Sequence, residues 1–328
     1  MRLHPRFLFI SLLLAAGFLI APAARAQHDD WPSKPIKLIV PFPPGGACDT
    51  IARIYGEKLA EELKQPVIIE NKPGAGTAIA AEFAARSSPD GYTLSVAPAG
   101  QLTLLPNLNK KVAYDSFRDF APISLLASVP NIIAANPALS VNTLQELITL
   151  AKNKPGKITY SSCGSGTLCH LTGERFKTQT GVDLLHIPYK GSAPAITALL
   201  GGEVDLAFDT QTVLSPQIRA GKVKALAITS TERSPLLPDV PTAAEAGLPG
   251  FVIEGWFSLV APAATPEAIV KKLNGALKAA SQSSAVREKL TAQGLTTLHS
   301  TPEELARLIR NDHAVWAKVI QTTGATLD

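Results

Sequence analysis

Short apolar runs alternate with longer amphipathic stretches along most of this chain, and this alternation restricts the possible folds more than any other feature. Runs such as Ile36–Val40 and Val67–Asn71 are typical of buried strands, whereas Asp49–Lys64 repeats its apolar residues with the period of a helix. Strands that alternate with helices form βαβ units with parallel strands. The sequence therefore predicts an α/β fold made of two doubly wound domains. The other expected strands are Tyr92–Ala97, Ile158–Ser161, Leu184–Pro188, Val204–Asp209 and Lys224–Ser230, and the other expected helices are Thr77–Ser87, Thr143–Asn153, Thr167–Thr178, Ala193–Leu200, Pro266–Ala280 and Pro302–Ile320.

Two apolar segments interrupt the alternation, Ile123–Ala135 and Phe251–Ala261. Each is long enough to pass from one lobe to another, so we interpret them as two crossings beside a single cleft. Lobe 1 is then discontinuous and comprises residues 27–126 and 256–328, whereas lobe 2 comprises residues 127–255.

The first 26 residues have the order of a secretory signal: Arg2 and Arg6, an uncharged apolar run at residues 7–20, and the small residues Ala24 and Ala26. The alternative is a membrane anchor, but the run is shorter than the ~20 residues that a spanning helix needs. We therefore expect cleavage after Ala26 and export of the mature chain.

The charge balance gives little support to an acidic partner. The 31 basic and 27 acidic residues give a net charge of +4, but the expected signal contains three arginines and no acid. The mature chain then has 28 basic residues against 27 acidic ones, a net charge of +1. Without a basic stripe, no nucleic-acid partner is expected. No Cys/His cluster has zinc spacing and no Walker motif occurs, so neither a metal nor a cofactor is predicted.

Three glycine-rich segments each follow a predicted strand and open a predicted helix: PFPPGGACD at 41–49, ENKPGAGT at 70–77 and SSCGSGTLCH at 161–170. Ligands of open α/β sheets bind at this edge, where glycines allow close approach and helix starts present free N–H groups. The first two loops suit a small anion such as a carboxylate without any Lys or Arg. The third could close on it from the other lobe through its N–H groups, Ser165 and Thr167.

Several side chains near these loops have two interpretations. Asp49 is either the N-cap of its helix or a ligand contact, and Arg53 one turn later is expected to pair with an acid. Asp209 ends a strand at the cleft edge and either caps the next helix or faces the ligand. His170 is either a structural hydrogen-bonding residue or a ligand donor.

The three cysteines also allow alternatives. Cys163 and His170 would be the nucleophile and base of a secreted hydrolase, but no orienting third group is identifiable and export favours oxidised sulfur. Cys163 and Cys169 flank one loop and are candidates for a local disulfide, which would leave Cys48 as the odd thiol. A bridge from Cys48 across the cleft would lock the lobes together.

Six motifs in order resemble the TctC-like, or Bug, periplasmic receptors of tripartite tricarboxylate transporters: WPSKPIKLIVPFPPGGACDTIAR, ENKPGAGT, GYTL, YKGSAPAITALLGGEVDLAFD, DVPTAAEAGLPGF and WFSLVAPAATP. The resemblance implies a two-lobed periplasmic-binding-protein fold of type II that closes on its ligand. It also implies a periplasmic receptor, not an enzyme, that delivers a small organic carboxylate to TctA/TctB-like permease subunits. The alternative is a receptor that presents the same ligand to a sensor kinase.

The resemblance also assigns ligand-binding positions. The two carboxylate-binding loops correspond to Pro44, Gly45, Gly46, Ala47, Cys48 and Asp49, and to Gly74, Ala75, Gly76 and Thr77, and the contacts of the second lobe correspond to Ser165, Gly166, Thr167, His170 and Asp209. This chain departs from the pattern, since relatives often have GAGG at positions 74–77 and a small or hydroxylated residue at position 48. Some relatives bridge the Cys matching Cys163 to a position that is Ser192 here, so Cys169 is the candidate replacement partner.

Overall fold

The computed structural model describes residues 31–323, and the expected signal at residues 1–26 lies outside them. The strands are β1 (Ile36–Val40), β2 (Val67–Asn71), β3 (Thr93–Pro98), β4 (Phe120–Ala135), β5 (Ile158–Ser162), β6 (Leu184–Pro188), β7 (Leu206–Thr210), β8 (Lys224–Ile228), β9 (Glu254–Pro262) and β10 (Thr296–Thr297). The helices are α2 (Ala47–Leu63), η1 (Ala75–Thr77), α3 (Ala78–Ala85), η2 (Gly100–Leu104), α4 (Leu105–Leu108), α5 (Leu144–Asn153), α6 (Leu168–Thr180), α7 (Ser192–Gly201), α8 (Gln211–Arg219), α9 (Glu267–Gln282), α10 (Ser284–Thr291) and α11 (Pro302–Thr323).

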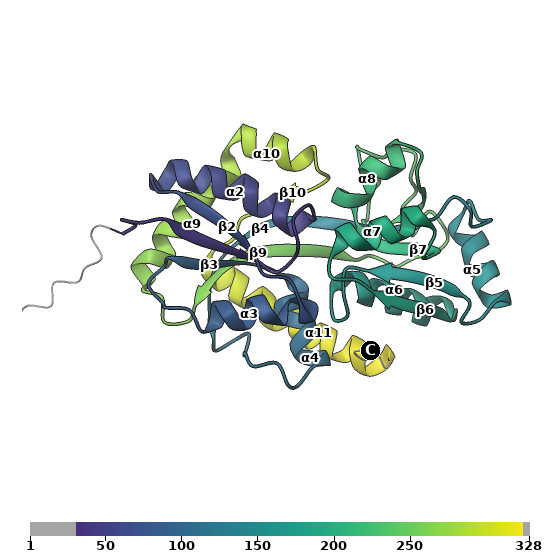
Figure 1. The fold of residues 1–328 in the computed structure, drawn as a ribbon, viewed down its shortest axis with the longest axis horizontal. Coiled ribbons are helices and arrows are strands. Elements are labelled where there is room, and N and C mark those ends of the chain that lie inside the picture. The colour runs from purple at the N-terminus through teal and green to yellow at the C-terminus, as the bar shows by residue number, and fades with distance from the viewer. Residues whose placement is uncertain (1–30, 324–328) are drawn as a thin grey trace, which may run out of the picture. The chain divides into compact units, whose positions relative to one another are not determined.

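Every strand and helix expected from the sequence is present, with ends shifted by a few residues (Figure 1). The sequence reasoning missed η1, η2, α4, α8, α10 and β10. Helix α8 contains Pro216, a residue that normally ends a helix, and α10 is a single short helix of mixed polarity. Within residues 31–323 no helix is both long and apolar enough to cross a membrane.

The two halves of the sheet have the same internal order. In the first half β1 lies between β2 and β3, and in the second β5 lies between β6 and β7, with parallel pairing throughout both triplets. One strand of each triplet pairs antiparallel with a long strand: β3 pairs with β9, and β7 pairs with β4. The expectation of two doubly wound α/β halves is therefore confirmed.

The long strands β4 and β9 connect the two halves, as the apolar crossing segments predicted (Figure 1). From Phe120 to Pro130, β4 pairs with β9, and from Asn131 onward it pairs with β7 on one side and β8 on the other. On the second crossing, Phe251 and Ile253 pack in the core of lobe 2, whereas later residues of β9 pack in lobe 1. The lobe boundaries given above stay a prediction.

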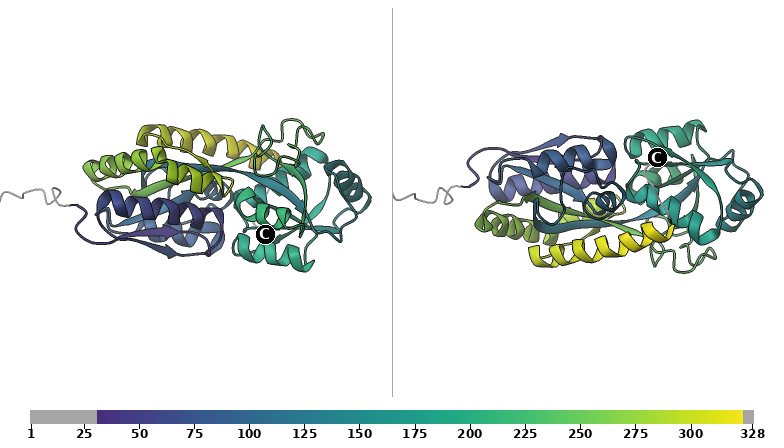
Figure 2. Two further views of the ribbon diagram at one scale, coloured as in Figure 1. Left: turned by 90° about the horizontal axis from the view of Figure 1, so that it is seen from above. Right: turned by 90° about the horizontal axis from the view of Figure 1, so that it is seen from below.

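Helices cover both faces of the sheet in each half. In lobe 2, Ile133 packs in the core with α5 and α6, whereas its neighbour Ile132 packs in the core with α7 and α8. Successive strand residues point to opposite faces, so β4 contributes to both cores. In lobe 1, α2, α9 and α10 contact one another, whereas α3 and α11 share a separate core that includes Val260 (Figure 2).

Helix α11 joins the two lobes a third time. Its first turns belong to lobe 1, where Leu305 and Ile309 are buried in the core. Its last turns carry Trp316 and Ile320, which pack with Leu171 of α6 in a small cluster of their own. The chain therefore crosses between lobes at β4 and β9 and makes a further contact through α11.

Candidate functional site

The first glycine-rich loop ends where α2 begins, at Ala47, with Gly46 as an N-cap in extended conformation. The expectation that Asp49 is the N-cap is wrong, because the helix starts two residues earlier and Asp49 lies in its first turn. The first N–H groups of a helix have no partner within it, and the peptide dipoles give this end partial positive charge. Gly46, Ala47 and Cys48 line the cavity described below.

Asp49 instead holds the loop together. Its carboxylate accepts hydrogen bonds from Gly45 N (3.1 Å), Asn71 Nδ2 (3.0 Å) and the Arg53 guanidinium (2.9 and 3.0 Å). Burial alone would raise the pKa of Asp49, but hydrogen bonds from Arg53, Asn71 and Gly45 outweigh it and lower the pKa. The predicted pairing of Arg53 with an acid is confirmed, and Asp49 does not line the cavity in the described structure.

The second loop is strained. Gly74, Ala75, Gly76 and Thr77 all have positive φ, at 131°, 48°, 59° and 89°. Glycine adopts these angles freely, but Ala75 and the β-branched Thr77 each incur a cost of about 1–3 kcal/mol. Strain of this kind concentrates at ligand sites. Gly76 and Thr77 both line the cavity, and the side chain of Thr77 is buried.

The third loop is held by its own polar groups. Thr167 is the N-cap of α6; its hydroxyl donates to Gly164 O (2.6 Å) and faces the His170 N–H. His170 accepts a hydrogen bond from Gly166 N at Nδ1 (3.2 Å), and its ring stacks on that of His186. These contacts give His170 a structural role. Thr167 lines the cavity, whereas Ser165, Gly166 and His170 do not in the described structure.

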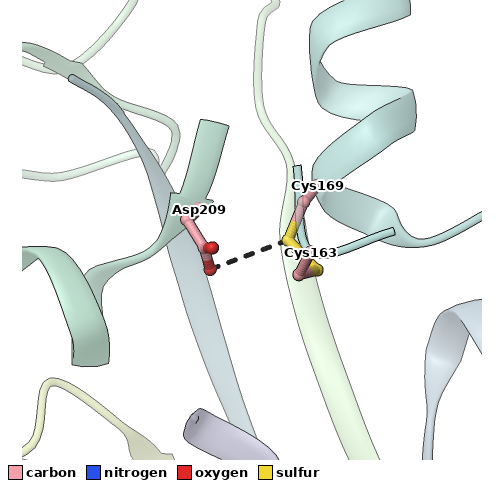
Figure 3. A group of neighbouring side chains, drawn as sticks. All are labelled: Cys163, Cys169 and Asp209. Carbon is pink, nitrogen blue, oxygen red and sulfur yellow. Dashed lines mark hydrogen bonds between the residues drawn. A yellow bond between two sulfur atoms is a disulfide. The ribbon is translucent and has the colours of Figure 1, made fainter. Parts of the chain in front are cut away.

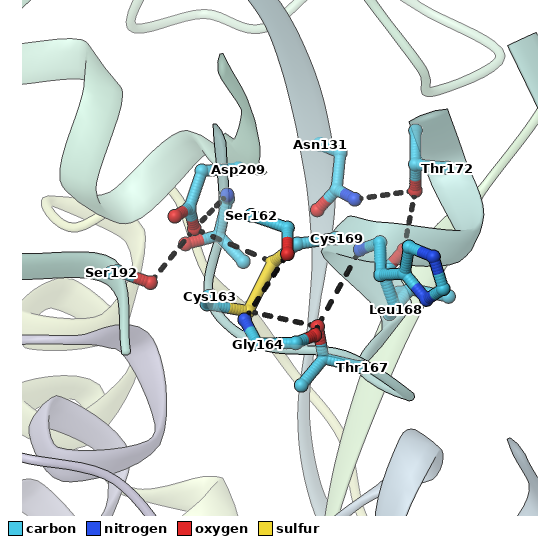
Figure 4. The surroundings of a disulfide bond; sticks show 12 residues. Asn131, Ser162, Cys163, Gly164, Thr167, Leu168, Cys169, Thr172, Ser192 and Asp209 are labelled. Atoms are coloured by element: carbon cyan, nitrogen blue, oxygen red, sulfur yellow. Dashed lines mark hydrogen bonds between the residues drawn. A yellow bond between two sulfur atoms is a disulfide. The ribbon is translucent and has the colours of Figure 1, made fainter. Parts of the chain in front are cut away.

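Cys163 and Cys169 are joined in a disulfide, with 6.0 Å between their Cα atoms (Figure 4). The bond closes the third loop and forms part of the cavity wall. Because the sulfur of Cys163 is oxidised, it lacks the thiol that the hydrolase alternative requires. Asp209 lies beside the two cysteines (Figure 3), but disulfide sulfur is not a thiolate ligand, so these three side chains do not form a metal site.

Thiol titration tests this arrangement. Cys48 is buried, which raises the pKa of its thiol, so folded protein should react slowly with a thiol reagent. Protein unfolded without reductant should titrate one thiol per chain, and protein unfolded after reduction should titrate three. Three thiols without reductant would contradict the Cys163–Cys169 bond.

A cavity of about 60 Å³ lies between the three loops and the crossing strands. Six of the predicted ligand-binding residues line it, namely Gly46, Ala47, Cys48, Gly76, Thr77 and Thr167, together with the two cysteines of the disulfide. Pro44, Gly45, Asp49, Gly74, Ala75, Ser165, Gly166, His170 and Asp209 are outside this lining. Among the lining residues of the described chain none carries a charged side chain, so an anion in the cavity would meet peptide dipoles and neutral polar groups.

Sequence reasoning missed several lining residues, of which Gln101, Asn131, Ser192 and Thr210 are polar. Gln101 follows β3, the one strand of the lobe 1 triplet whose terminal loop was not considered. Asn131 is the one amide side chain inside the crossing segment Ile123–Ala135, whose other polar residues are two serines, and Thr210 directly follows Asp209. A large polar side chain in a mostly apolar strand was the signal available for Asn131.

Asp209 is fully buried behind this wall. Its Oδ1 accepts hydrogen bonds from Ser192 Oγ (2.9 Å) and Thr210 N (2.7 Å), and its Oδ2 has no hydrogen-bond partner among residues 31–323. Burial raises the pKa of Asp209 to about 6, although the hydrogen bonds from Thr210 and Ser192 act in the opposite direction. Asp209 thus orients Ser192 and the residue before α8 through these hydrogen bonds (Figure 4).

Two glycines allow the lobes to approach closely at the cavity. A Cβ on Gly76 would collide with the Ser165 carbonyl oxygen of the third loop, and a Cβ on Gly191 would lie 2.7 Å from Pro43 Cδ of the first loop. Real Cβ atoms do not approach this closely, so the structure has these loops in an arrangement that only glycine permits.

Two βαβ lobes, joined by crossing strands that border a cavity, define the fold of the two-lobed periplasmic binding proteins, and solved members of that class superpose on this chain. Family and fold are those of solute-binding receptors rather than of enzymes.

The chain belongs to the tripartite tricarboxylate transporter family receptors, because residues 51–325 match the model of the TctC family. It is 40% identical to protein BugT of Bordetella pertussis over 324 residues, 96% of this chain and 98% of that protein. An R. palustris protein solved with adipate is 35% identical, with a TM-score of 0.88 over 91% of this chain and 100% of that one. MatC from Rhodopseudomonas palustris with bound malate is 36% identical, with a TM-score of 0.84 over 88% of this chain and 100% of that one.

Proposed function

We propose that this chain is a periplasmic receptor that captures a small organic carboxylate in the cavity between its lobes and delivers it to a tripartite tricarboxylate-type membrane permease. One observation carries the proposal: the first N–H groups of α2 and the strained 74–77 loop border a cavity that no charged side chain of residues 31–323 lines. Backbone N–H groups at helix starts bind carboxylates without help from a cation.

The capture step follows from the two glycine contacts. The carboxylate docks on the first two loops of lobe 1, and lobe 2 then swings shut around β4 and β9. Closure brings the third loop to Gly76 and the start of α7 to Pro43, which removes the ligand from water. Relatives solved with adipate and malate support a carboxylate ligand.

Delivery to the permease rests on the family. The chain belongs to a family of receptors of tripartite tricarboxylate transporters, which supports TctA/TctB-like membrane subunits as partners. The periplasmic location is supported by the expected signal sequence and by the solved relative described as a periplasmic binding protein.

A thermal-shift screen tests carboxylate binding. Protein refolded from denaturant, to remove any ligand carried through purification, is screened with mono-, di- and tricarboxylates, amino acids and aromatic acids. An acid present at about 100 times its Kd should stabilise the fold by about 2.7 kcal/mol and raise Tm by about 5 °C. The methyl ester of each active acid is the matched control and should give no shift. If no acid raises Tm, the proposal is wrong.

A further inference from the structure

The cavity wall carries buried polar atoms that the protein itself leaves unpaired. Thr77 Oγ1, Asn131 Oδ1 and both amide atoms of Gln101 have no hydrogen-bond partner within the described part of the chain, and all three side chains line the cavity. Their exposed fractions are 2%, 0% and 0%. Buried polar groups in folded proteins are nearly always paired, so several unpaired ones on residues that line a single cavity indicate groups that a ligand completes.

The orientation of the Asn131 amide is set by its neighbours (Figure 4). The hydroxyl of Thr172 donates its single proton to Leu168 O (2.8 Å), so it can only accept at its other contact. The atom of Asn131 that faces Thr172, at 2.7 Å, must therefore be the donor Nδ2. Oδ1 is thereby left as the atom without a partner in the described chain, and its position as an acceptor is fixed by the contact of Nδ2 with Thr172.

An acceptor of this kind discriminates between acids. A ligand hydroxyl or ammonium group can donate to Asn131 Oδ1, whereas a methylene leaves the oxygen buried and unpaired, and an ionised carboxylate places acceptor against acceptor. Gln101 has a free donor and a free acceptor and can rotate to suit either kind of group, so it does not impose this choice.

We infer that this receptor selects carboxylates that bear a hydroxyl or ammonium group over unsubstituted acids of the same carbon skeleton. Asn131 Oδ1, whose position is fixed by Thr172, accepts a hydrogen bond from that group. The inference rests on the proposed function and deepens it, because it names the class of carboxylate. Asn131 is the specificity-determining residue, and Thr172 is a positioning residue that acts through it.

Titration calorimetry on matched acids tests the inference. L-malate and L-aspartate are compared with succinate, and L-lactate and L-alanine with propionate, at one pH and ionic strength. We expect the substituted acid of at least one set to bind ~10- to 100-fold more tightly. If malate binds more tightly than aspartate, the donor is a hydroxyl group. If aspartate binds more tightly than malate, the donor is an ammonium group.

Two variants locate the discriminating atom. Asn131→Ala removes the acceptor, and the isosteric Thr172→Val releases the amide to rotate, so both should reduce the preference to within ~3-fold. Asn136→Ala is the matched control: Asn136 is also buried and donates from Nδ2 to Leu199 O (2.6 Å), but it is not among the cavity-lining residues of the described structure. It should keep the preference even where it lowers stability.

The outcomes separate the two proposals. Equal binding of substituted and unsubstituted acids overturns the inference and leaves carboxylate capture standing. A preference that persists in both Asn131→Ala and Thr172→Val overturns the role of Asn131. If neither these acids nor any in the thermal-shift screen binds, carboxylate capture itself fails, and the inference fails with it.

Discussion

Gly76→Ala is expected to lower the affinity for the best carboxylate at least ~100-fold, equivalent to about 3 kcal/mol. The new Cβ would collide with the Ser165 carbonyl oxygen, a backbone atom that cannot rotate away, so the third loop could not reach its place over the ligand. Titration calorimetry measures the loss, and small-angle scattering should show that saturating ligand no longer makes the receptor more compact.

Backbone strain has to be separated from this collision, because Gly76 has a φ of +59°. Gly181→Ala is the matched control: its φ is +68°, and an added Cβ there meets no atom within 4 Å. Gly181→Ala should lower the free energy of unfolding by about 1–2 kcal/mol and leave the affinity for the carboxylate unchanged. Gly76→Ala should lower the free energy of unfolding by a similar amount through the same backbone strain. Gly46→Ala, whose Cβ would lie 3.9 Å from Ser192, should also permit closure. Wild-type affinity in Gly76→Ala would contradict the closure mechanism.

Asp209→Asn is expected to stabilise the ligand-free receptor at pH 8 by about 2 kcal/mol and to have little effect at pH 4. The folded pKa of about 6 lies above the ordinary value of 3.8, so ionising the buried carboxylate costs about 3 kcal/mol once the pH exceeds the folded pKa. That cost grows as the pH rises from about 4 to 6 and is absent where both states are protonated. Asparagine keeps the Oδ1 acceptor but adds an unpaired amide donor, which offsets part of the gain.

Urea unfolding at pH 4, 6 and 8 measures this difference, and Asp49→Asn provides a control of opposite sign. The folded pKa of Asp49 is lowered, so its contribution to stability is present above the unfolded pKa and is lost as the pH falls through the folded pKa. Asp49→Asn should therefore destabilise the protein at pH 8. A gain in Asp209→Asn that does not change with pH would show that burial of the charge is not its source.

Much of the fold could be predicted because its signals are local. Ile36–Val40 is apolar at every position except Lys37, and the helices between strands repeat apolar residues with the helical period. The change of partners along β4 at Pro130 and Asn131 was beyond such reasoning, since pairing with β9, β7 and β8 joins segments far apart in the chain. Pro216 similarly hid α8, because local sequence argues against a helix that tertiary packing stabilises.

The residues of the candidate site likewise fall into those that local sequence signals predicted and those whose role depends on distant partners. Glycines after strands marked the loops, so Gly46, Gly76 and Thr167 could be found from the sequence. Asp49 could not be assigned, because the partner that decides its role, Asn71, is 22 residues away. Asn131 was missed because its significance depends on Thr172, a residue on another element that fixes which of its two amide atoms faces the cavity.

The C-terminal helix has a consequence for how this receptor is tuned. Trp316 and Ile320 of α11 pack against α6, the helix that starts at the third loop. Any motion that carries α6 away from lobe 1 must therefore separate this apolar contact or make it slide. The free-energy cost of losing the contact then affects the equilibrium between the open and closed arrangements of the lobes. Under the proposed closure, Trp316 and Ile320 therefore contribute to ligand affinity, although neither lines the cavity in the described structure.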